Sequence, residues 1–227
     1  MGLKTIKLFT PSCVLCNDVA EEISLCESCQ QDLPKIQYSC YQCGLPFKEK
    51  INDTLCGQCQ QSSPPIDYLI SSLAYDYPVD YLVSQLKFNR NLTFAKILSQ
   101  LLLNTLQSQQ HELPDLIIPV PLHKKRLRKR GFNQALEIAR PIAKILNIPL
   151  NKQVIKRTKQ TEAQSLLNAI ERKKNLRQSF KIIKSITAKH VVIIDDVVTT
   201  GATVFELAKL LKKSGVEKVG VWAVARA

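Results

Sequence analysis

His190 to Thr203 reads HVVIIDDVVTTGAT, and this stretch determines which fold the chain can adopt. Its apolar run, Val191 to Ile194, is too short and too β-branched for a helix and indicates a strand buried on both faces, as in a parallel sheet. After Gly201, apolar residues recur at helical spacing as far as Gly215. The turn between the two elements therefore lies at a helix N-terminus, where free N–H groups and the positive end of the helix dipole attract a phosphate.

The composition of this turn suits a sugar phosphate. Gly201 lacks a Cβ atom and lets the backbone approach a phosphate closely. Asp195 and Asp196 precede the turn and are suited to accept hydrogen bonds from the vicinal hydroxyls of a ribose, or to hold Mg²⁺. An ordinary turn with an Asp helix cap is the alternative, but a cap does not require two acids before Thr-Thr-Gly-Ala-Thr. The hydroxyl donors of the turn are Thr199, Thr200 and Thr203.

This segment resembles the phosphoribosyl pyrophosphate (PRPP) loop of type I phosphoribosyltransferases. Two further stretches narrow the resemblance to the ComF/GntX family, whose members are competence-associated proteins with N-terminal cysteine pairs. The first stretch is PVPLHKKRLRKRGFNQA, from Pro119 to Ala135. The second carries, in order, Arg157, Thr161, Gln164, Leu166, Arg172, Asn175 and Phe180. The resemblance covers essentially the whole chain.

The resemblance implies an α/β fold: a type I phosphoribosyltransferase-like parallel sheet flanked by helices, with a small N-terminal zinc-ribbon module. The alternation of strand and helix patterns calls independently for a parallel sheet with right-handed crossovers. The resemblance also implies PRPP with Mg²⁺ as the ligand, and Asp195 and Asp196 as the catalytic pair. The implied PRPP-binding residues are Asp195, Asp196, Val197, Thr199, Thr200, Gly201, Ala202 and Thr203.

A cluster of cations follows a second predicted strand. Leu116 to Val120 reads as that strand and Phe132 to Leu146 as the next helix, with HKKRLRKR as the loop between them. Such a loop is where an open α/β sheet binds ligands, and the resemblance makes it the pyrophosphate-binding loop. Six cations exceed the need of one diphosphate and suggest a longer polyanion; a solvated basic loop is the alternative. The six are Lys124, Lys125, Arg126, Arg128, Lys129 and Arg130.

Arg157 to Phe180 is predicted to form a mobile flap. Val154 and Ile155 end a short strand, Leu166 to Leu176 has a partly amphipathic helical pattern, and RTKQTEAQS between them has no apolar periodicity. The resemblance gives this segment a hood-like role over the ligand. It adds four residues to the predicted pyrophosphate- or DNA-binding set: Arg157, Thr161, Gln164 and Arg172. A merely solvated helix face is the alternative for the cations near Arg172.

All eight cysteines lie in the first 59 residues, in four C-x-x-C pairs. Each pair can place two thiolates on one metal, and four thiolates satisfy tetrahedral Zn²⁺, so we expect two closed, structural zinc sites. Disulfides are the alternative, and sequential pairing of the knuckles is preferred to an interleaved cross-brace. The predicted ligands are Cys13, Cys16, Cys26, Cys29, Cys40, Cys43, Cys56 and Cys59.

The net charge of +13 is distributed unevenly along the 227 residues. Residues 119–177 hold sixteen Lys or Arg against three acids, so the rest of the chain is neutral. Any contact with nucleic acid should therefore come from this segment rather than from the zinc module. Aromatic residues are only 6% of the chain, so DNA binding should be modest, salt-dependent and almost blind to sequence. The candidate stacking residues are Phe132, Phe88, Phe180 and Tyr81.

The chain divides into a zinc module over residues 1–63 and a phosphoribosyltransferase-like domain over residues 64–227, with Ser62 to Pro65 as the boundary. In the second part we expect a strand at Leu69 to Tyr75, helices from Pro78 to Leu86 and from Thr93 to Gln110, and a last strand at Val219 to Val224. No apolar run of about 18 residues occurs, which predicts a cytoplasmic protein without membrane insertion.

Three function hypotheses follow. The first is a competence protein that binds PRPP or a similar sugar phosphate and handles single-stranded DNA in the cytoplasm. The second is an active phosphoribosyltransferase, with Mg²⁺ on the diphosphate, acting on an acceptor that the sequence does not identify. The third is a zinc-dependent adaptor that docks DNA-uptake proteins, such as a helicase, or recombination mediators. Turnover and oligomeric state stay open at this point.

Overall fold

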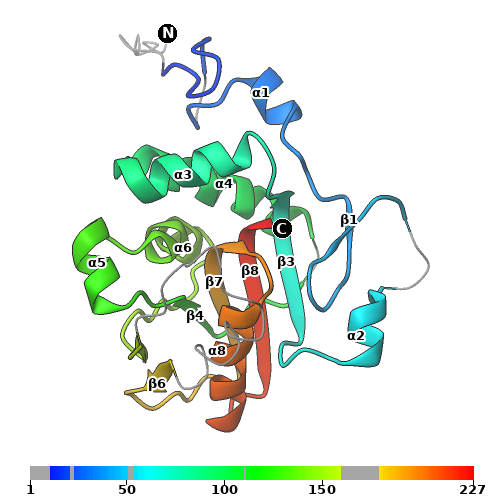
Figure 1. Ribbon diagram of the computed structural model, residues 1–227, viewed down its shortest axis with the longest axis vertical. Coiled ribbons are helices and arrows are strands. Elements are labelled where there is room, and N and C mark those ends of the chain that lie inside the picture. Colours follow the sequence, from blue (N-terminus) through cyan, green and yellow to red (C-terminus); the bar gives the residue numbers. More distant parts are fainter. Residues whose placement is uncertain (1–10, 21–22, 51–53, 110, 160–178) are drawn as a thin grey trace, which may run out of the picture.

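The computed structural model describes residues 11–20, 23–50, 54–109, 111–159 and 179–227 (Figure 1). At its centre lies a four-stranded, fully parallel sheet in the order β3-β8-β7-β4. The strands are β3 (Tyr68–Ala74), β4 (Leu116–Pro119), β7 (His190–Val198) and β8 (Lys218–Arg226). The predicted α/β class with a parallel phosphoribosyltransferase-type sheet is confirmed.

The central strand β7 is longer than predicted. Its prediction as Val191 to Ile194 is wrong at the C-terminal end, because the strand runs on to Val198 and includes both aspartates. Asp195 pairs with Ala223 of β8, and Val197 with Ala225. Aspartate is a poor strand former, but here the neighbouring strand holds the backbone and tertiary contacts hold the carboxylates.

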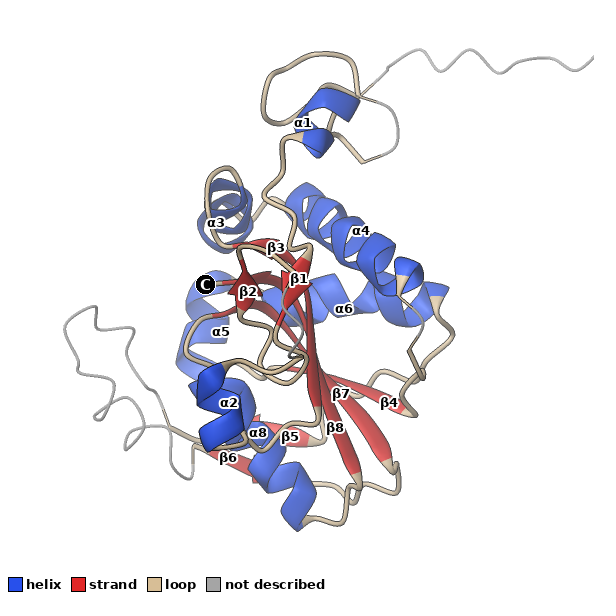
Figure 2. Ribbon diagram, turned by 90° about the vertical axis from the view of Figure 1, so that its right-hand side faces the viewer, coloured by secondary structure: helices blue, strands red, loops and turns tan. Residues whose placement is uncertain are grey.

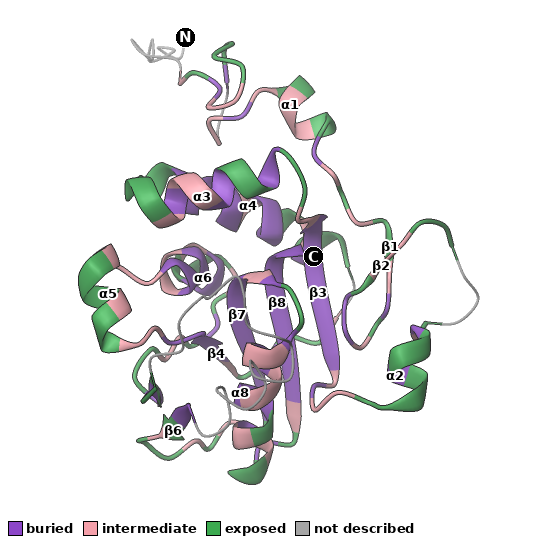
Figure 3. Ribbon diagram, in the orientation of Figure 1, coloured by how far each residue is buried: buried purple, intermediate pink, exposed green. Residues whose placement is uncertain are grey.

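Helices cover both faces of the sheet (Figures 1 and 2). On one face lie α3 (Val79–Asn89), α4 (Leu92–Ser108) and α6 (Gln134–Ile145), and on the other lies α8 (Ala202–Lys213). The helices predicted at Pro78 to Leu86, at Thr93 to Gln110, at Phe132 to Leu146 and after Gly201 are each present within a few residues of their predicted limits. The buried faces form two apolar cores, one on each side of the sheet, and Figure 3 shows that the four strands between them are almost wholly buried.

The segment after β4 is not a loop. The prediction of a loop over HKKRLRKR is wrong, because Lys124–Arg130 form helix α5. His123 caps its N-terminus by accepting a hydrogen bond from the Lys125 N–H, and Gly131 ends it in the left-handed conformation at φ 89°. Lys, Arg and Leu are good helix formers, and the three cations of the last turn interact favourably with the negative end of the helix dipole.

A two-stranded antiparallel ribbon lies at the base of the predicted flap. It pairs β5 (Ile155–Arg157) with β6 (Phe180–Ile182). Residues 160–178 between them lie outside the described part of the chain, so the predictions for Thr161, Gln164 and Arg172, and for a helix at Leu166 to Leu176, are not addressed by the structure.

The cysteine-rich segment contains α1 (Glu27–Gln31), β1 (Tyr38–Ser39), β2 (Pro46–Phe47) and α2 (Gly57–Gln61). Part of it joins the outer edge of β3 through backbone hydrogen bonds. The Ile36 N–H donates to the Ser72 carbonyl at 3.1 Å, and the Leu69 N–H donates to the Tyr41 carbonyl at 3.0 Å. The segment is therefore packed on the sheet edge. Among the described residues, no helix combines the length and apolar character needed to cross a membrane.

Candidate functional site

The two predicted acids lie where β7 approaches its carboxyl end, and both are buried. Lys87, in the last turn of α3, forms an ion pair with the Asp196 Oδ2 atom. The Gln134 side-chain amide, at the start of α6, donates to Asp196 Oδ1 at 3.4 Å. Gln134 in turn accepts a hydrogen bond from Arg130 at 2.6 Å, which links the aspartate to the end of α5.

The two carboxyl groups differ in protonation. Burial, together with the neighbouring charge of Asp196, raises the pKa of Asp195 well above its usual value. Burial also opposes ionisation of Asp196, but the Lys87 ammonium and hydrogen bonds from Asp195, Lys87 and Gln134 outweigh it, and the pKa of Asp196 is lowered. The pair therefore favours a single negative charge, held on Asp196.

Three of the predicted cations converge on this end of the sheet. Arg157 is buried, and its guanidinium lies 5.4 Å from the centroid of the Phe180 ring. Burial lowers the pKa of Arg157, the charge of Arg126 lowers it further, and the charge of Asp195 opposes that shift. Burial also lowers the pKa of Arg130, against the charge of Asp196. Arg130 thus lies within electrostatic range of Asp196 and Arg157 within that of Asp195, while Arg126 acts on both arginines.

The remaining cations of α5 have a different environment. Lys124, Lys125, Arg128 and Lys129 are exposed to solvent. The structure therefore divides the predicted basic set into a part near the acids and a part on the surface.

Of the predicted stacking residues, Phe180 is only 4% exposed and cannot stack on an external base, so that prediction is wrong. Phe88 is 74% exposed and is accessible to a base.

The threonine-rich turn has the predicted form. Gly201 adopts the left-handed conformation at φ 76° and caps the N-terminus of the 12-residue helix α8. A Cβ atom at this position would overlap the Phe205 ring, so both backbone and packing require glycine. Thr199 and Thr200 are exposed, whereas Val197, Ala202 and Thr203 are half-buried. The turn therefore presents backbone N–H groups and hydroxyls to solvent beside the acid pair.

Arg226, near the end of β8, supports this turn from below. Its side chain is buried and donates to the Val198 carbonyl at 3.2 Å and to the Thr199 carbonyl. Its Nε–H also donates to the Cys43 carbonyl at 3.0 Å. One guanidinium thus links the turn after β7 to the cysteine-rich segment. A planar guanidinium with five N–H donors is suited to this role.

Lys87, Gln134 and Arg226 are functional-site residues that the sequence analysis does not include. Each lies in an ordinary helix or strand pattern, far along the chain from the acid pair. Only the tertiary fold brings them to the site.

The eight cysteines form two tetrads, and within each the four sulfur atoms all lie within 4.8 Å of one another. Four thiolates bound to one Zn²⁺ at about 2.3 Å would lie about 3.8 Å apart. The Cys16–Cys26 and Cys43–Cys56 sulfur separations, 3.5 and 3.6 Å, fit this geometry. The first two pairs form one tetrad and the last two the other, so sequential pairing is confirmed and the cross-brace is excluded. Both tetrads support Zn²⁺.

Comparison with known proteins defines the class. Residues 130–227 match the phosphoribosyl transferase domain, and residues 6–60 match the double zinc ribbon domain. The chain therefore combines a phosphoribosyltransferase-type domain with an N-terminal double zinc ribbon.

Relatives identify the family. The chain is 37% identical to DNA utilization protein YhgH of Escherichia coli (strain K12) over 206 residues, covering 89% of this chain and 90% of the relative. It is 33% identical to Competence protein F of Haemophilus influenzae over 210 residues, with the same coverage. This chain belongs to the ComF/GntX family. The solved structure of adenine phosphoribosyltransferase from Leishmania tarentolae is 18% identical, with a TM-score of 0.38; the match covers 66% of this chain and 74% of that structure.

The unequal acids predict opposite effects of two isosteric substitutions. Asp196→Asn should lower the free energy of unfolding by about 2 kcal/mol at pH 7, because Lys87 loses its partner. The folded-state pKa of Asp195 is raised, so the stability that this group contributes is present at acid pH and lost as the pH rises toward its folded-state pKa. Asp195→Asn has no group to titrate at this position, so it does not lose this stability. Its free energy of unfolding should therefore exceed that of the wild type by an amount that grows as the pH rises. Urea unfolding at pH 5 and pH 8 measures both; a shift of the same sign in the two variants would contradict the assignment.

Arg226→Gln should loosen the threonine turn, because four carbonyl groups, two of them in the turn segment, lose a charged donor. We expect faster amide hydrogen exchange over residues 198–203 and 40–44, and a loss of about 1–3 kcal/mol of stability. Arg140→Gln is the matched control, since Arg140 is half-exposed on α6 and pairs only with Glu137 among the described acids. If the amide hydrogen exchange rates of residues 198–203 are the same in Arg226→Gln as in the wild type, the guanidinium does not hold the turn.

Proposed function

We propose that this chain is a competence-associated protein that binds PRPP or a related sugar phosphate at the junction of β7 and α8 and handles single-stranded DNA in the cytoplasm. The observation that carries the proposal is the threonine turn at the N-terminus of α8, beside two buried acids. The names of the relatives, DNA utilization protein YhgH and Competence protein F, supply the biological setting.

The sugar-phosphate part follows from charge and geometry. The 5-phosphate would bind the free N–H groups and hydroxyls of residues 199–203, where the dipole of α8 favours an anion. The ribose hydroxyls would donate to Asp195 and Asp196, and Lys87 occupies part of that hydrogen-bonding capacity in the absence of ligand. Arg126, Arg130 and Arg157 would neutralise a diphosphate. Bound Mg²⁺ would add positive charge to the same group.

Phosphoribosyl transfer to an unidentified acceptor is the second candidate function. It is favoured by the single negative charge of the acid pair, which would stabilise positive charge developing on the ribosyl ring. The cations around the acids would stabilise the leaving diphosphate. A phosphoribosyltransferase-like site can also bind its ligand for regulation without turnover. A zinc-dependent adaptor role, with DNA-uptake helicases or recombination mediators as partners, is compatible with the surface position of the ribbon.

The DNA part rests on the exposed face of α5. Its four outer cations, Lys124, Lys125, Arg128 and Lys129, form no ion pair with an acid in the described part of the chain. Free cations at regular spacing attract a phosphate backbone and release its counterions, without reading bases.

Binding of PRPP with Mg²⁺ should raise the melting temperature by about 5–11 °C at a hundredfold excess over Kd, since the ligand binds only the folded state. Gly201→Ala should abolish the shift, because the added methyl group displaces the turn. Gly215→Ala is the matched control, because Gly215 also has a positive φ, 97°, just after the other end of α8, and an added Cβ atom would have no neighbour within 4 Å in the described part of the chain beyond the two adjacent residues. A wild-type protein that shows no shift would refute the sugar-phosphate site.

Charge reversal on α5 should weaken binding of a single-stranded oligonucleotide and flatten its salt dependence. For Lys125→Glu with Arg128→Glu, the slope of log K against log salt should fall by about 0.7 for each phosphate contact removed. Lys209→Glu with Lys213→Glu, on the exposed face of α8, changes the net charge equally and is the control. Equal slopes for the two double variants would exclude α5 as the DNA contact.

A further inference from the structure

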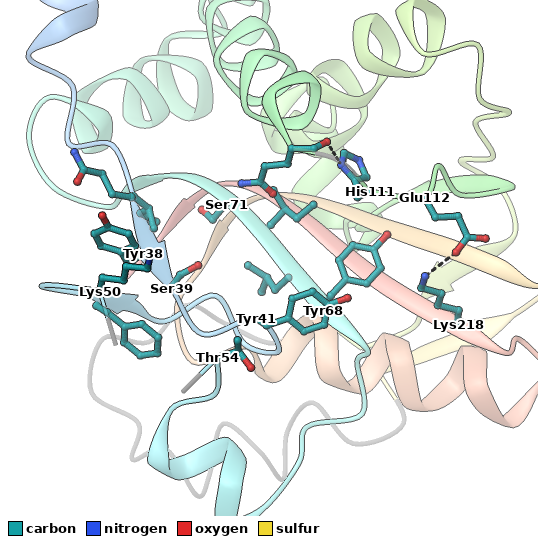
Figure 4. A pocket seen from close by; sticks show the side chains of 16 residues that line it. Tyr38, Ser39, Tyr41, Lys50, Thr54, Tyr68, Ser71, His111, Glu112 and Lys218 are labelled. Atoms are coloured by element: carbon teal, nitrogen blue, oxygen red, sulfur yellow. Dashed lines mark hydrogen bonds and ion pairs between the residues drawn. The ribbon is translucent and has the colours of Figure 1, made fainter. Parts of the chain in front are cut away.

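A cavity lies between the zinc ribbon that carries Cys40 to Cys59 and the outer edge of β3 (Figure 4). Its volume of about 590 Å³ is in the range of small-molecule sites. Aromatic residues are unusually frequent in its walls, given how few the chain contains: Tyr38, Tyr41, Phe47 and Tyr68. Aromatic rings that line a cavity offer flat surfaces on which another ring can stack.

Tyr41 is the most exposed of these rings, at 59%, and it is held firmly. It lies within the knuckle between Cys40 and Cys43, so a zinc ion held by these two cysteines would fix the backbone on both sides. Its N–H donates to the Thr54 carbonyl at 2.7 Å, and its carbonyl accepts from the Leu69 N–H of β3. Its ring centroid lies 6.3 Å from that of Tyr68, at an interplanar angle of 37°. An exposed aromatic ring on a rigid support is suited to bind a partner with little loss of entropy.

Polar groups complete the lining. The His111 Nδ1 atom lies 3.0 Å from the Gln109 carbonyl, which favours a proton on Nδ1 and leaves Nε2 as an acceptor. That Nε2 atom is buried and has no hydrogen-bond partner among the described residues. Lys50 is exposed at one end of the cavity, while Lys218 pairs with Glu112 at the other (Figure 4). The cavity thus has stacking surfaces, an imidazole nitrogen in its wall without a partner among the described residues, and an exposed ammonium group.

We propose that this cavity binds an unpaired base of single-stranded DNA. The base would stack on Tyr41, its polar edge would meet groups such as His111, and the adjoining phosphate would lie near Lys50. The inference deepens the DNA-binding part of the proposed function and rests on it. In the sheet order, β3 and β4 are the opposite edges, so this cavity and α5 are separate contacts on the molecule. The ribbon would supply stacking, which the basic segment largely lacks, and α5 would supply charge.

The test compares a thymidine oligonucleotide with one of equal length that has no bases. Tyr41→Ala should weaken binding of the first about tenfold, the scale of one lost stacking contact, and leave binding of the second unchanged. Tyr41→Phe should bind both as wild type does, because the ring remains. Tyr77→Ala is the control, since Tyr77 is 78% exposed and does not line the cavity. Two zinc ions per chain and an unchanged melting temperature establish that each variant is folded.

Tyr38→Ala, in the wall of the same cavity, gives an independent variant should Tyr41→Ala fail to fold. Equal losses for both oligonucleotides, or no loss in either variant, would overturn the proposal. The proposal would also be overturned if the cavity bound an extended peptide along β3, and if Tyr41→Ala abolished binding of that peptide but not binding of DNA. If Tyr41→Ala leaves DNA binding unchanged but charge reversal on α5 still flattens the salt dependence of binding, only the proposal for this cavity is refuted. Wild-type protein that binds neither oligonucleotide refutes the DNA-handling function as well.

Discussion

The ion pair between Lys87 and Asp196 is the interaction on which the site depends. It allows the central strand to carry two adjacent carboxylates through a buried region, where an unpaired charge would be costly. Because Lys87 belongs to α3 and Gln134 to α6, the same contacts fix two helices against the end of β7. The acids are therefore held in place by the fold itself, with the pKa of Asp195 raised and that of Asp196 lowered.

The zinc module is part of this arrangement through Arg226. Its guanidinium donates to the Cys43 carbonyl and to the start of the threonine turn, so the cysteine knuckle and this turn share one support. The same knuckle holds Tyr41 against the edge of β3. A structural metal held by this knuckle would stabilise two surfaces of the molecule, one on each side of β3, and would give a physical reason for a ribbon on a phosphoribosyltransferase-type domain.

The features that depend on local sequence could be predicted. Cysteine pairing follows from the spacing of each knuckle, and the turn at Gly201 follows from the strand, glycine and helix that surround it. Helix α5 could not be predicted, because its only apolar residue, Leu127, gives no periodicity, and its caps His123 and Gly131 are weak signals. The length of β7 and the roles of Lys87 and Arg226 depend on contacts across the fold, where tertiary packing overrides local propensity.

A crystal structure of the protein with ribose 5-phosphate and Mg²⁺ tests the central claim most directly. The account predicts the phosphate on the backbone N–H groups of residues 199–203 and the ribose hydroxyls on Asp195 and Asp196, with the Lys87 contact to Asp196 lengthened. A ligand bound elsewhere, or an empty turn beside an unchanged ion pair at saturating ligand, would contradict it.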